Sequence, residues 1–385
     1  MNKNVPEIRF QGFHDDWEQR KLGDFLKIFD RKSTIDNEYT VLSSTNSGME
    51  YRQGRVSSNS NKGYKIIEIG DLVLSPQNLW LGNININNLS VGLVSPSYKT
   101  FKFINVNPGF IRPQLKLERM LWNYKSVSTQ GASVVRRNLE LDGFYKIKLL
   151  VPKHNEQNQL EKLFATIDNL ITLHQRKLNL LQEQKKSLLQ KMFPKKDEKI
   201  PEIRFNGFTD DWEQRKFDSL VKRVAKTSEE NLPSVEYDDV ISGYGKLNKN
   251  VALKGNNRKG ILFQEDDILF GKLRPYLKNW LIADFKGIAI GDWWVFRSNI
   301  NSQFTYTLIQ TKQYETISNL STGTKMPRSD WKIVANSEFR VPINNVEQTK
   351  VGTLFKKLDN LITLHQRKLD ALQEQKKGLL QKMFV

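Results

Sequence analysis

The sequence contains no cysteine among its 385 residues. This absence excludes disulfide bonds, thiolate nucleophiles and cysteine-ligated zinc sites, and it is typical of a cytoplasmic protein. No apolar run approaches the ~20 residues that a helix needs to cross a bilayer, and the N-terminus has no signal-peptide core. We therefore expect a cytoplasmic protein that has no membrane partner.

The sequence also lacks the short motifs of common enzymes. It has neither a GxxxxGK[ST] phosphate-binding loop nor an HExxH zinc motif. The segment Asn107–Phe110 (NPGF) is similar to the Asn-Pro-Pro-aromatic motif of amino-methyltransferases but lacks the second proline, so we interpret it as a turn. These observations predict a protein with no catalytic residue, no metal site and no cofactor.

Acidic residues are in the minority. The chain has 60 Lys+Arg against 42 Asp+Glu, which gives a net charge of +18. Such an excess favours a polyanionic partner, because basic side chains release counterions when they bind phosphates. The excess lies in residues 51–150 and 251–350 and in the C-terminal stretch of each half, whereas residues 1–50 and 201–250 are slightly acidic. The charge pattern therefore occurs twice.

An internal duplication explains this pattern. Pro6–Lys21 and Pro201–Lys216 match at fourteen of sixteen positions, and Leu163–Phe193 and Leu354–Phe384 match at twenty-five of thirty-one. The inserts between these flanks, residues 22–150 and 217–340, look almost unrelated. Their short apolar runs, bounded by Gly, Asn, Ser or Pro, predict α/β or mostly β domains.

Two faint correspondences remain inside the inserts. Gly70-Asp71-Leu72-Val73 is similar to Asp266-Asp267-Ile268-Leu269, and Gly131 and Gly323 are each followed five residues later by an arginine, Arg136 and Arg328. Because these pairs occur in the same order, we infer that the inserts share a common ancestor.

The second repeat predicts a long helix in each half. Asn155 and Asn345 are the expected N-caps, and Glu156 and Glu347 lie in the positive first turn. Residues spaced alternately by three and four form a coiled-coil seam over four heptads. The seam residues are Phe164, Ile167, Ile171, His174, Leu178, Leu181, Lys185, Leu188 and Met192, and in the second copy Phe355, Leu358, Ile362, His365, Leu369, Leu372, Lys376, Leu379 and Met383.

Two nearly identical seams within one chain predict an antiparallel pair related by a pseudo-two-fold axis. The polar seam residues, His174 and Lys185 with their copies, are expected to fix the register of the pair. This geometry brings Val385 near Pro6. A seam of 29 residues at ~1.5 Å per residue is about 42 Å long, which is comparable to one turn of B-DNA at about 34–36 Å.

The duplicated plan resembles the specificity subunit of Type I restriction–modification systems along essentially the whole chain. The resemblance rests on Trp17–Gly23 (WEQRKLG) with its copy Trp212–Lys216, on Gly323–Arg328 (GTKMPR), and on the doubled helix with its EQKKxLLQKMF ending. Residues 131–136 (GASVVR) of the first insert depart from the later motif, so its role is not transferred there.

The resemblance implies an α+β fold with two pseudo-symmetric target recognition domains separated by an antiparallel two-helix coiled coil. The expected boundaries are 1–153 for the first recognition domain, 154–193 for the first helix, 194–200 for a linker, 201–343 for the second recognition domain and 344–385 for the second helix. The implied protein is a non-catalytic subunit that reads a bipartite, asymmetric site on double-stranded DNA. Two methyltransferase subunits and the restriction and translocase subunits are its implied protein partners in phage defence.

Base readout requires Arg or Lys for guanine and Asn or Gln for adenine. Polar, glycine-bounded loops of both inserts carry such residues. The candidates are Arg52, Gln53, Arg55, Asn61, Lys62, Gln77, Asn78, Arg136 and Arg137 in the first insert, and Lys246, Asn248, Lys249, Asn257, Arg258, Lys259, Lys272, Arg274, Lys325 and Arg328 in the second.

Two other classes of protein remain open from the sequence. The first is a self-contained methyltransferase or nuclease with unfamiliar motifs, which would act on DNA without partners. The second is an RNA-binding or purely scaffolding coiled-coil protein, which competition between duplex DNA and RNA would identify.

Overall fold

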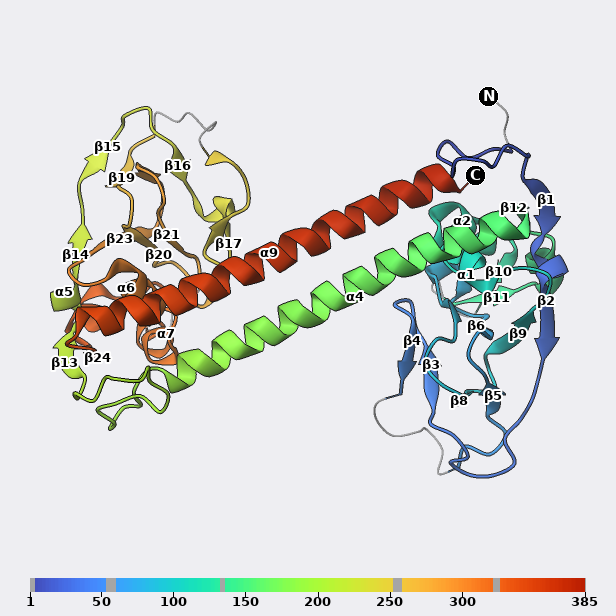
Figure 1. Cartoon of the computed structure of the whole chain (residues 1–385), viewed down its shortest axis with the longest axis horizontal. Coiled ribbons are helices and arrows are strands. Elements are labelled where there is room, and N and C mark those ends of the chain that lie inside the picture. The colour runs from blue at the N-terminus through green and yellow to red at the C-terminus, as the bar shows by residue number, and fades with distance from the viewer. Residues whose placement is uncertain (1–3, 53–59, 132–135, 252–257, 321–325, 385) are drawn as a thin grey trace. The chain divides into compact units, whose positions relative to one another are not determined.

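The computed structural model describes residues 4–52, 60–131, 136–251, 258–320 and 326–384. The chain divides into two compact units, of which unit 1 is Met1–Leu173 with Leu369–Val385 and unit 2 is His174–Lys368 (Figure 1). Each unit thus contains one insert, one half of each long helix and the opening block of one repeat. Within the described parts, no helix is both long and apolar enough to cross a membrane.

Unit 1 is built on a four-stranded sheet with the order β2-β9-β6-β7, in which all pairs are antiparallel. Leu72, Leu74 and Phe101 of this sheet belong to the buried core of the unit. The elements of its insert and flanks are β1 Glu18–Lys21, β2 Leu26–Phe29, β3 Leu42–Ser44, β4 Met49–Tyr51, β5 Lys65–Ile67, β6 Leu72–Leu74, β7 Ile84–Ile86, β8 Gly92–Val94, β9 Lys99–Phe103, α1 Pro108–Ile111, α2 Glu118–Ser126, β10 Ser128–Gln130, β11 Arg137–Leu139, α3 Leu141–Tyr145 and β12 Lys148–Val151.

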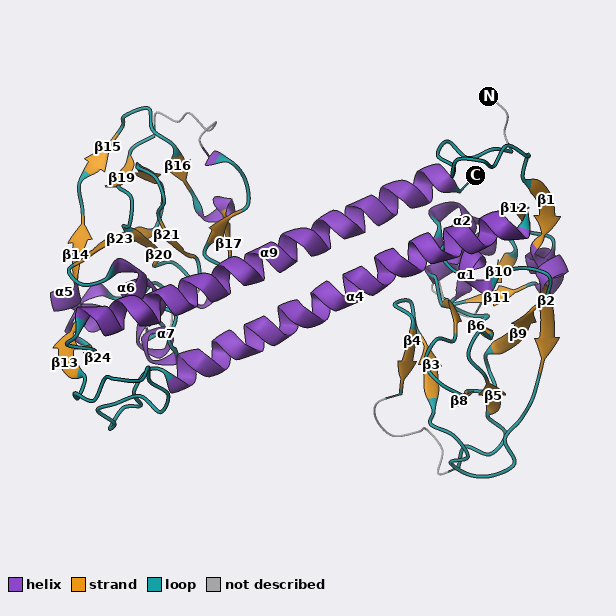
Figure 2. Cartoon of the chain, viewed as in Figure 1, coloured by secondary structure: helices purple, strands orange, loops and turns teal. Residues whose placement is uncertain are grey.

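Unit 2 repeats this sheet with the order β14-β23-β20-β21, again antiparallel throughout (Figure 2). The two inserts therefore have the same central topology although their sequences look unrelated. The elements of unit 2 are β13 Glu213–Lys216, α5 Phe217–Leu220, β14 Val221–Val224, β15 Thr227–Ser228, β16 Ser234–Val235, β17 Val240–Ile241, β18 Lys246–Leu247, β19 Gly260–Phe263, β20 Ile268–Gly271, β21 Trp280–Ile282, β22 Gly287–Ala289, β23 Trp293–Ser298, α6 Ser302–Leu308, α7 Lys312–Ser318, α8 Trp331–Asn336 and β24 Glu338–Val341.

The repeated opening block closes each insert. Its strand, β1 or β13, pairs antiparallel with the last strand of the insert, so that Glu18 lies opposite Val151 and Glu213 opposite Val341. The start and the end of each insert are therefore side by side. This arrangement makes each insert a module held at one place on a common frame.

The long helices are α4, His154–Lys191, and α9, Asn345–Met383. The predicted caps were wrong by one or more residues. Helix α4 already begins at His154, so Asn155 lies inside its first turn. Helix α9 begins at Asn345, and the residue before it, Asn344, accepts a hydrogen bond from the backbone N–H of Val346 at 2.8 Å.

The first turn of each long helix is anchored by a buried ion pair. Arg9 donates to both carboxylate oxygens of Glu156 at 2.7 and 2.8 Å, and Arg204 donates to those of Glu347 at 2.6 and 2.8 Å. Both glutamate side chains are only 1% exposed. The opening block of each repeat is thus joined to the helix that leaves the same insert.

Asn107 provides another link between an insert and its helix, and the interpretation of its segment as a turn was wrong. Asn107 caps the short helix α1 by accepting from the backbone N–H of Gly109, and its amide donates to Asn158 and Glu161 of α4 at 2.7 and 2.6 Å. Asn301 caps α6 in the same way in unit 2. The segment therefore has a structural role.

Within each unit the two helices are antiparallel, as the seam predicted. In unit 1 the ring of Phe384 lies 5.4 Å from that of Phe164, and in unit 2 Phe193 lies 6.3 Å from Phe355. All eighteen proposed seam residues are buried or half-buried. The polar ones meet partners on the other helix: Lys185 binds Asp359 and Lys376 binds Asp168, each at 2.6 Å, and His174 meets its own copy, His365.

The Nδ1 atoms of His174 and His365 lie 2.9 Å apart, which allows one hydrogen bond only if they do not both carry protons. Burial and the neighbouring His174 lower the pKa of His365. Because the unfolded state binds this proton more readily, the free energy of unfolding should fall as the pH drops below about 6.5, the unfolded pKa. Urea midpoints at pH 7.5 and 5.5 check this. His365→Gln should reduce the loss between the two pH values, and an equal loss in both proteins would contradict the assignment.

Val385, which was predicted to lie near Pro6, is outside the described residues, but the residues just before it contact the first opening block, as the antiparallel geometry predicted. The backbone N–H of Ile8 donates to the carbonyl of Lys382 at 3.0 Å, and Phe384 packs against Trp17. In unit 2, Ile203 and Lys191 form the equivalent bond at 2.9 Å. The end of α9 and the first opening block are therefore close enough for a short linker to join them.

We expect a circular permutant, joined through a short linker and reopened near Lys196, to fold with a melting temperature within a few degrees of the natural chain. The reason is that both new ends leave the repeated contacts in place. Thermal unfolding measures the effect. The control is a permutant reopened at Gln175, inside α4, which should be strongly destabilised; equal loss in both permutants would contradict the prediction.

Candidate nucleic-acid interface

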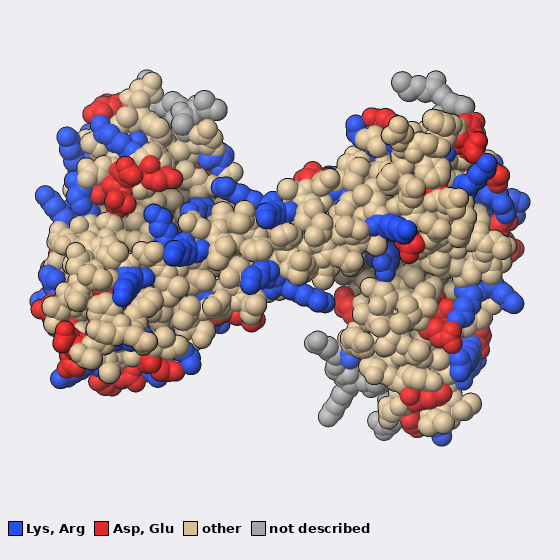
Figure 3. All heavy atoms as spheres, in the orientation of Figure 1, with Lys and Arg blue, Asp and Glu red and all other residues tan. Residues whose placement is uncertain are grey.

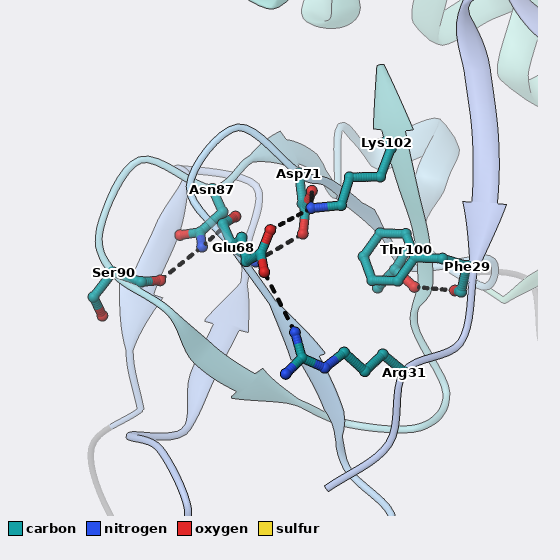
Figure 4. Close-up of polar contacts among 8 residues, drawn as sticks. All are labelled: Phe29, Arg31, Glu68, Asp71, Asn87, Ser90, Thr100 and Lys102. Carbon is teal, nitrogen blue, oxygen red and sulfur yellow. Dashed lines mark hydrogen bonds and ion pairs between the residues drawn. The ribbon is translucent and has the colours of Figure 1, made fainter. Parts of the chain in front are cut away.

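Strand β6 is one of the two inner strands of the unit 1 sheet, and we call it and its counterpart β20 in unit 2 the central strands. Strand β6 begins at a turn that is fixed by one aspartate. Asp71 accepts the backbone N–H of Glu68 at 2.7 Å, and Lys102 of β9 lies 3.0 Å from Asp71 and 2.6 Å from Glu68 (Figure 4). These contacts raise the pKa of Lys102, chiefly through the hydrogen bond that Lys102 donates to Glu68. Gly70 supplies the positive φ, 92°, that the turn requires.

Unit 2 contains an equivalent turn, which is also fixed by an aspartate. Asp267 accepts the backbone N–H of Gln264 at 2.9 Å and is bound by Arg297 of β23 at 2.8 Å, while Asp266 takes the positive φ of 66°. The predicted correspondence of Gly70–Val73 with Asp266–Leu269 is therefore confirmed. It aligns the two inserts residue by residue at the central strand.

The alignment continues beyond the strand. Both central strands are followed by a 3₁₀ turn, Leu79–Leu81 (η2) or Pro275–Leu277 (η6), which ends at a residue in the left-handed region, Gly82 or Lys278. The next residue is an asparagine in both units. Asn83 accepts from Ser44 and Asn279 from Ser242, each at 2.7 Å. The turn thus occupies the same place in both domains.

The late segment of each insert packs beside this turn. In unit 1 the backbone N–H of Arg137 donates to Gln77 at 3.2 Å. In unit 2 the backbone N–H of Arg274 donates to Pro327 at 2.7 Å, and Leu273 and Arg328 form a β-bridge. The structure therefore brings together Gln77, Asn78, Arg136 and Arg137 in one domain, and Lys272, Arg274 and Arg328 in the other.

Asp292 balances part of the charge in the second cluster. Arg328 lies 3.1 Å and Lys272 3.6 Å from its carboxylate. The hydroxyl of Tyr237 donates to the carbonyl of Asp292 at 2.7 Å and accepts from the N–H of Leu273 at 3.1 Å. Burial raises the pKa of Tyr237, so this hydroxyl stays protonated and keeps the turn fixed.

The remaining candidates of unit 2 lie on other segments of the insert. Gly243, next to the hairpin of β17 and β18, donates to Lys278 at 2.9 Å. On and after this hairpin, Lys246 reaches Asn360 of α9 at 3.5 Å, Asn248 donates to the carbonyl of Asp238 at 2.6 Å, and Lys249 binds Asp239 at 2.6 Å. Arg258 is paired with Glu236, and Lys259 is exposed. Most of these cations already have acidic or polar partners.

The other candidates of unit 1 are more scattered. Arg52, Lys62 and Arg136 are exposed. Asn61 is only 3% exposed, and its amide exchanges hydrogen bonds with Asn37, so the structure does not present it to DNA. The guanidinium of Arg137 is half-buried and donates to the carbonyl of Ser128 at 2.6 Å, which gives it a structural contact. Gln53, Arg55, Asn257 and Lys325 lie outside the described residues.

Tyr276, which was not among the sequence candidates, is 51% exposed in the turn η6. In the sequence it appears as an aromatic residue beside a proline, flanked by Arg274 and Lys278.

On the face shown in Figure 3, basic side chains occur on both units with acidic ones among them. Among the described residues, no group of three or more His, Asp or Glu side chains could hold a metal ion.

Comparisons with known proteins agree with this arrangement. Residues 209–374 match the family described as Type I restriction modification DNA specificity domain. The chain is 23% identical, over 98% of its length and 94% of the relative's, to the Type I restriction enzyme MjaVIII specificity subunit of Methanocaldococcus jannaschii. Its fold is similar to that of the Type I restriction-modification S subunit of M. genitalium, with a TM-score of 0.68, 11% identity and 99% of each chain covered.

The resemblance that the repeats indicated is thus found independently in a family match, in a relative of nearly equal length and in a solved fold. The repeated frame and both inserts lie in the parts of the chain that these matches cover. Residues 209–374 thus carry the sequence signature of the Type I restriction modification DNA specificity domain, and the whole chain is similar in sequence and in fold to Type I specificity subunits.

Proposed function

We propose that the chain reads a bipartite, asymmetric site on double-stranded DNA, with one half-site per recognition domain. The observation that carries this proposal is the turn after the central strand. In both domains it follows the strand at the same position, forms a 3₁₀ turn and ends in a left-handed residue, yet it presents Gln77 and Asn78 in one domain and Lys272 and Arg274 in the other. Equal scaffolds with different polar side chains are what two different half-sites require.

The same chain serves as a platform for the catalytic subunits. The opening blocks and long helices are almost identical in the two repeats, including the buried pairs Arg9–Glu156 and Arg204–Glu347. Two equal surfaces suit two copies of one partner, the methyltransferase subunit, and the restriction and translocase subunits join this assembly. The chain itself performs no chemical step.

Mapping methylated adenines in the host genome tests the proposal. We expect one split, asymmetric motif that disappears when the gene for this chain is deleted and returns when it is restored. An unchanged motif after deletion would contradict the proposal. Methylation or cleavage of DNA by the purified chain alone would instead support a self-contained enzyme, and stronger binding to RNA than to duplex DNA would support an RNA-binding protein.

The stoichiometry of the complex is a separate prediction. At saturation, one copy of this chain should bind two copies of the methyltransferase subunit, because the frame is duplicated. Native mass spectrometry measures this ratio directly. A complex that retains only one methyltransferase at saturating concentration would contradict the equivalence of the two surfaces.

A further inference from the structure

The turn after the central strand begins at one defined residue in each domain, Asn78 before η2 and Arg274 before η6. The two positions correspond because each turn ends in a left-handed residue, Gly82 or Lys278, followed by an asparagine that accepts a serine hydroxyl. Asn78 and Arg274 therefore occupy equivalent positions in the two domains, but the side chain is an amide in the first and a guanidinium in the second.

The backbone of Arg274 is held in a conformation that arginine seldom takes. Its φ and ψ are 49° and 60°, in the left-handed region. Its N–H donates to Pro327 at 2.7 Å, and the preceding N–H, of Leu273, donates to the Tyr237 hydroxyl at 3.1 Å. Such strain persists only where the surroundings fix it, and it occurs often at ligand-binding positions. The direction of this side chain is thus set by the fold.

The guanidinium of Arg274 is exposed and, within the described part of the chain, makes no hydrogen bond or ion pair. Its neighbours Lys272 and Arg328 differ, since both are bound to Asp292. An arginine with a fixed backbone and unengaged donors matches the O6 and N7 acceptors of guanine, which it binds with two parallel hydrogen bonds.

Asn78 offers the complementary chemistry in unit 1. Its backbone carbonyl accepts from Leu81 at 3.1 Å, whereas its half-buried amide makes no hydrogen bond to any residue in the described ranges. An asparagine amide pairs with N6 and N7 of adenine in the major groove. The same position is therefore equipped for a different base in each domain.

We propose that this position determines specificity in both domains, with Arg274 reading a guanine in the second half-site and Asn78 reading an adenine in the first. The proposal rests on the proposed function, because it presupposes that each domain reads one half-site. It goes further in assigning one base type to one residue in each domain.

The test uses the complete methyltransferase complex and a set of duplexes that carries every single-base change in the site. The main variant is Arg274→Gly, because glycine accepts the positive φ without strain and so removes the side chain without disturbing the turn. Asn78→Ala is the variant for the first domain. Lys222→Ala, at an exposed lysine of strand β14 that is not among the candidate DNA contacts, is the control.

Arg274→Gly should weaken binding to the natural site on the order of 10- to 100-fold and remove discrimination at one guanine, leaving the first half-site unchanged. Asn78→Ala should do the same at one adenine of the first half-site. Loss of affinity that is equal for all sequences, with a shallower salt dependence, would show a phosphate contact and overturn the assignment. The assignment would also be overturned if the wild-type complex were specific and the variant complex discriminated between the bases equally well. If the wild-type complex showed no bipartite specificity, the proposed function would fail instead.

Discussion

Replacing Glu347 with alanine should lower the free energy of unfolding of unit 2 by about 3–5 kcal/mol, because it leaves a buried guanidinium without its partner. Arg204 is 13% exposed and donates two hydrogen bonds to this carboxylate. The indole N–H of Trp212 also donates to Glu347, at 3.3 Å, and loses its acceptor. Urea denaturation of the full chain measures the change.

The matched control is Lys199→Ala, which breaks the pair of Lys199 with Asp211 at 3.1 Å. Both side chains of this pair are at least 60% exposed, so the loss should stay below about 1 kcal/mol. Replacing Arg204 and Glu347 together with Met and Leu should recover most of the stability, since no uncompensated charge remains. Equal losses in Glu347→Ala and Lys199→Ala would contradict the anchoring role.

The frame could be predicted from the sequence because its physics is local and repeated. The seam residues recur with heptad spacing, and both copies of the repeat contain the same pattern. The pairing of the helices and their antiparallel direction therefore followed from periodicity and symmetry. The cap of α9 was misplaced because Asn344 and Asn345 are adjacent and both are good cap residues. The structure places Asn344 before the helix and Asn345 at its first position.

The common fold of the inserts was largely hidden in the sequence. It is maintained by contacts between distant residues, such as Ser44 with Asn83 and Ser242 with Asn279, which have no local signature. The turn aspartates, Asp71 and Asp267, are one of the few correspondences that remain visible in the sequence. Because β-sheet packing fixes burial patterns and not residue identity, the two sheets diverged without changing their order.

The candidate DNA contacts were chosen by residue type, and residue type does not reveal what a side chain already binds. Asn61 met the criterion but is buried against Asn37, and Lys249 met it but is paired with Asp239. Arg274 met the same criterion and has no such partner among the described residues. The structure therefore reduces the number of candidate DNA contacts, because it shows which side chains are already bound within the protein.

Exchanging residues 22–150 for the insert of a relative should replace the first half-site completely and leave the second unchanged. The reason is that each insert closes on its own frame strands, β1 with β12 and β13 with β24. Affinity for the original site should fall about 10³-fold or more, to the level of non-specific binding. Methylome sequencing of cells that carry the exchanged chain reads both half-sites in one experiment.

The donor insert must keep one contact to the helix for this exchange to succeed. The N–H of Asn107 donates to Gln157 of α4 at 2.9 Å, and that of Asn301 donates to Gln348 of α9 at 3.1 Å. Each glutamine in turn donates to the proline carbonyl before its helix, at 2.8 Å. A donor insert with an asparagine at this position should fold. The same chimera with that asparagine changed to proline serves as the misfolded control, since a proline has no backbone N–H to donate to the glutamine. If the folded chimera altered both half-sites, the two domains would not read DNA independently, and the assignment of one half-site to each would be wrong.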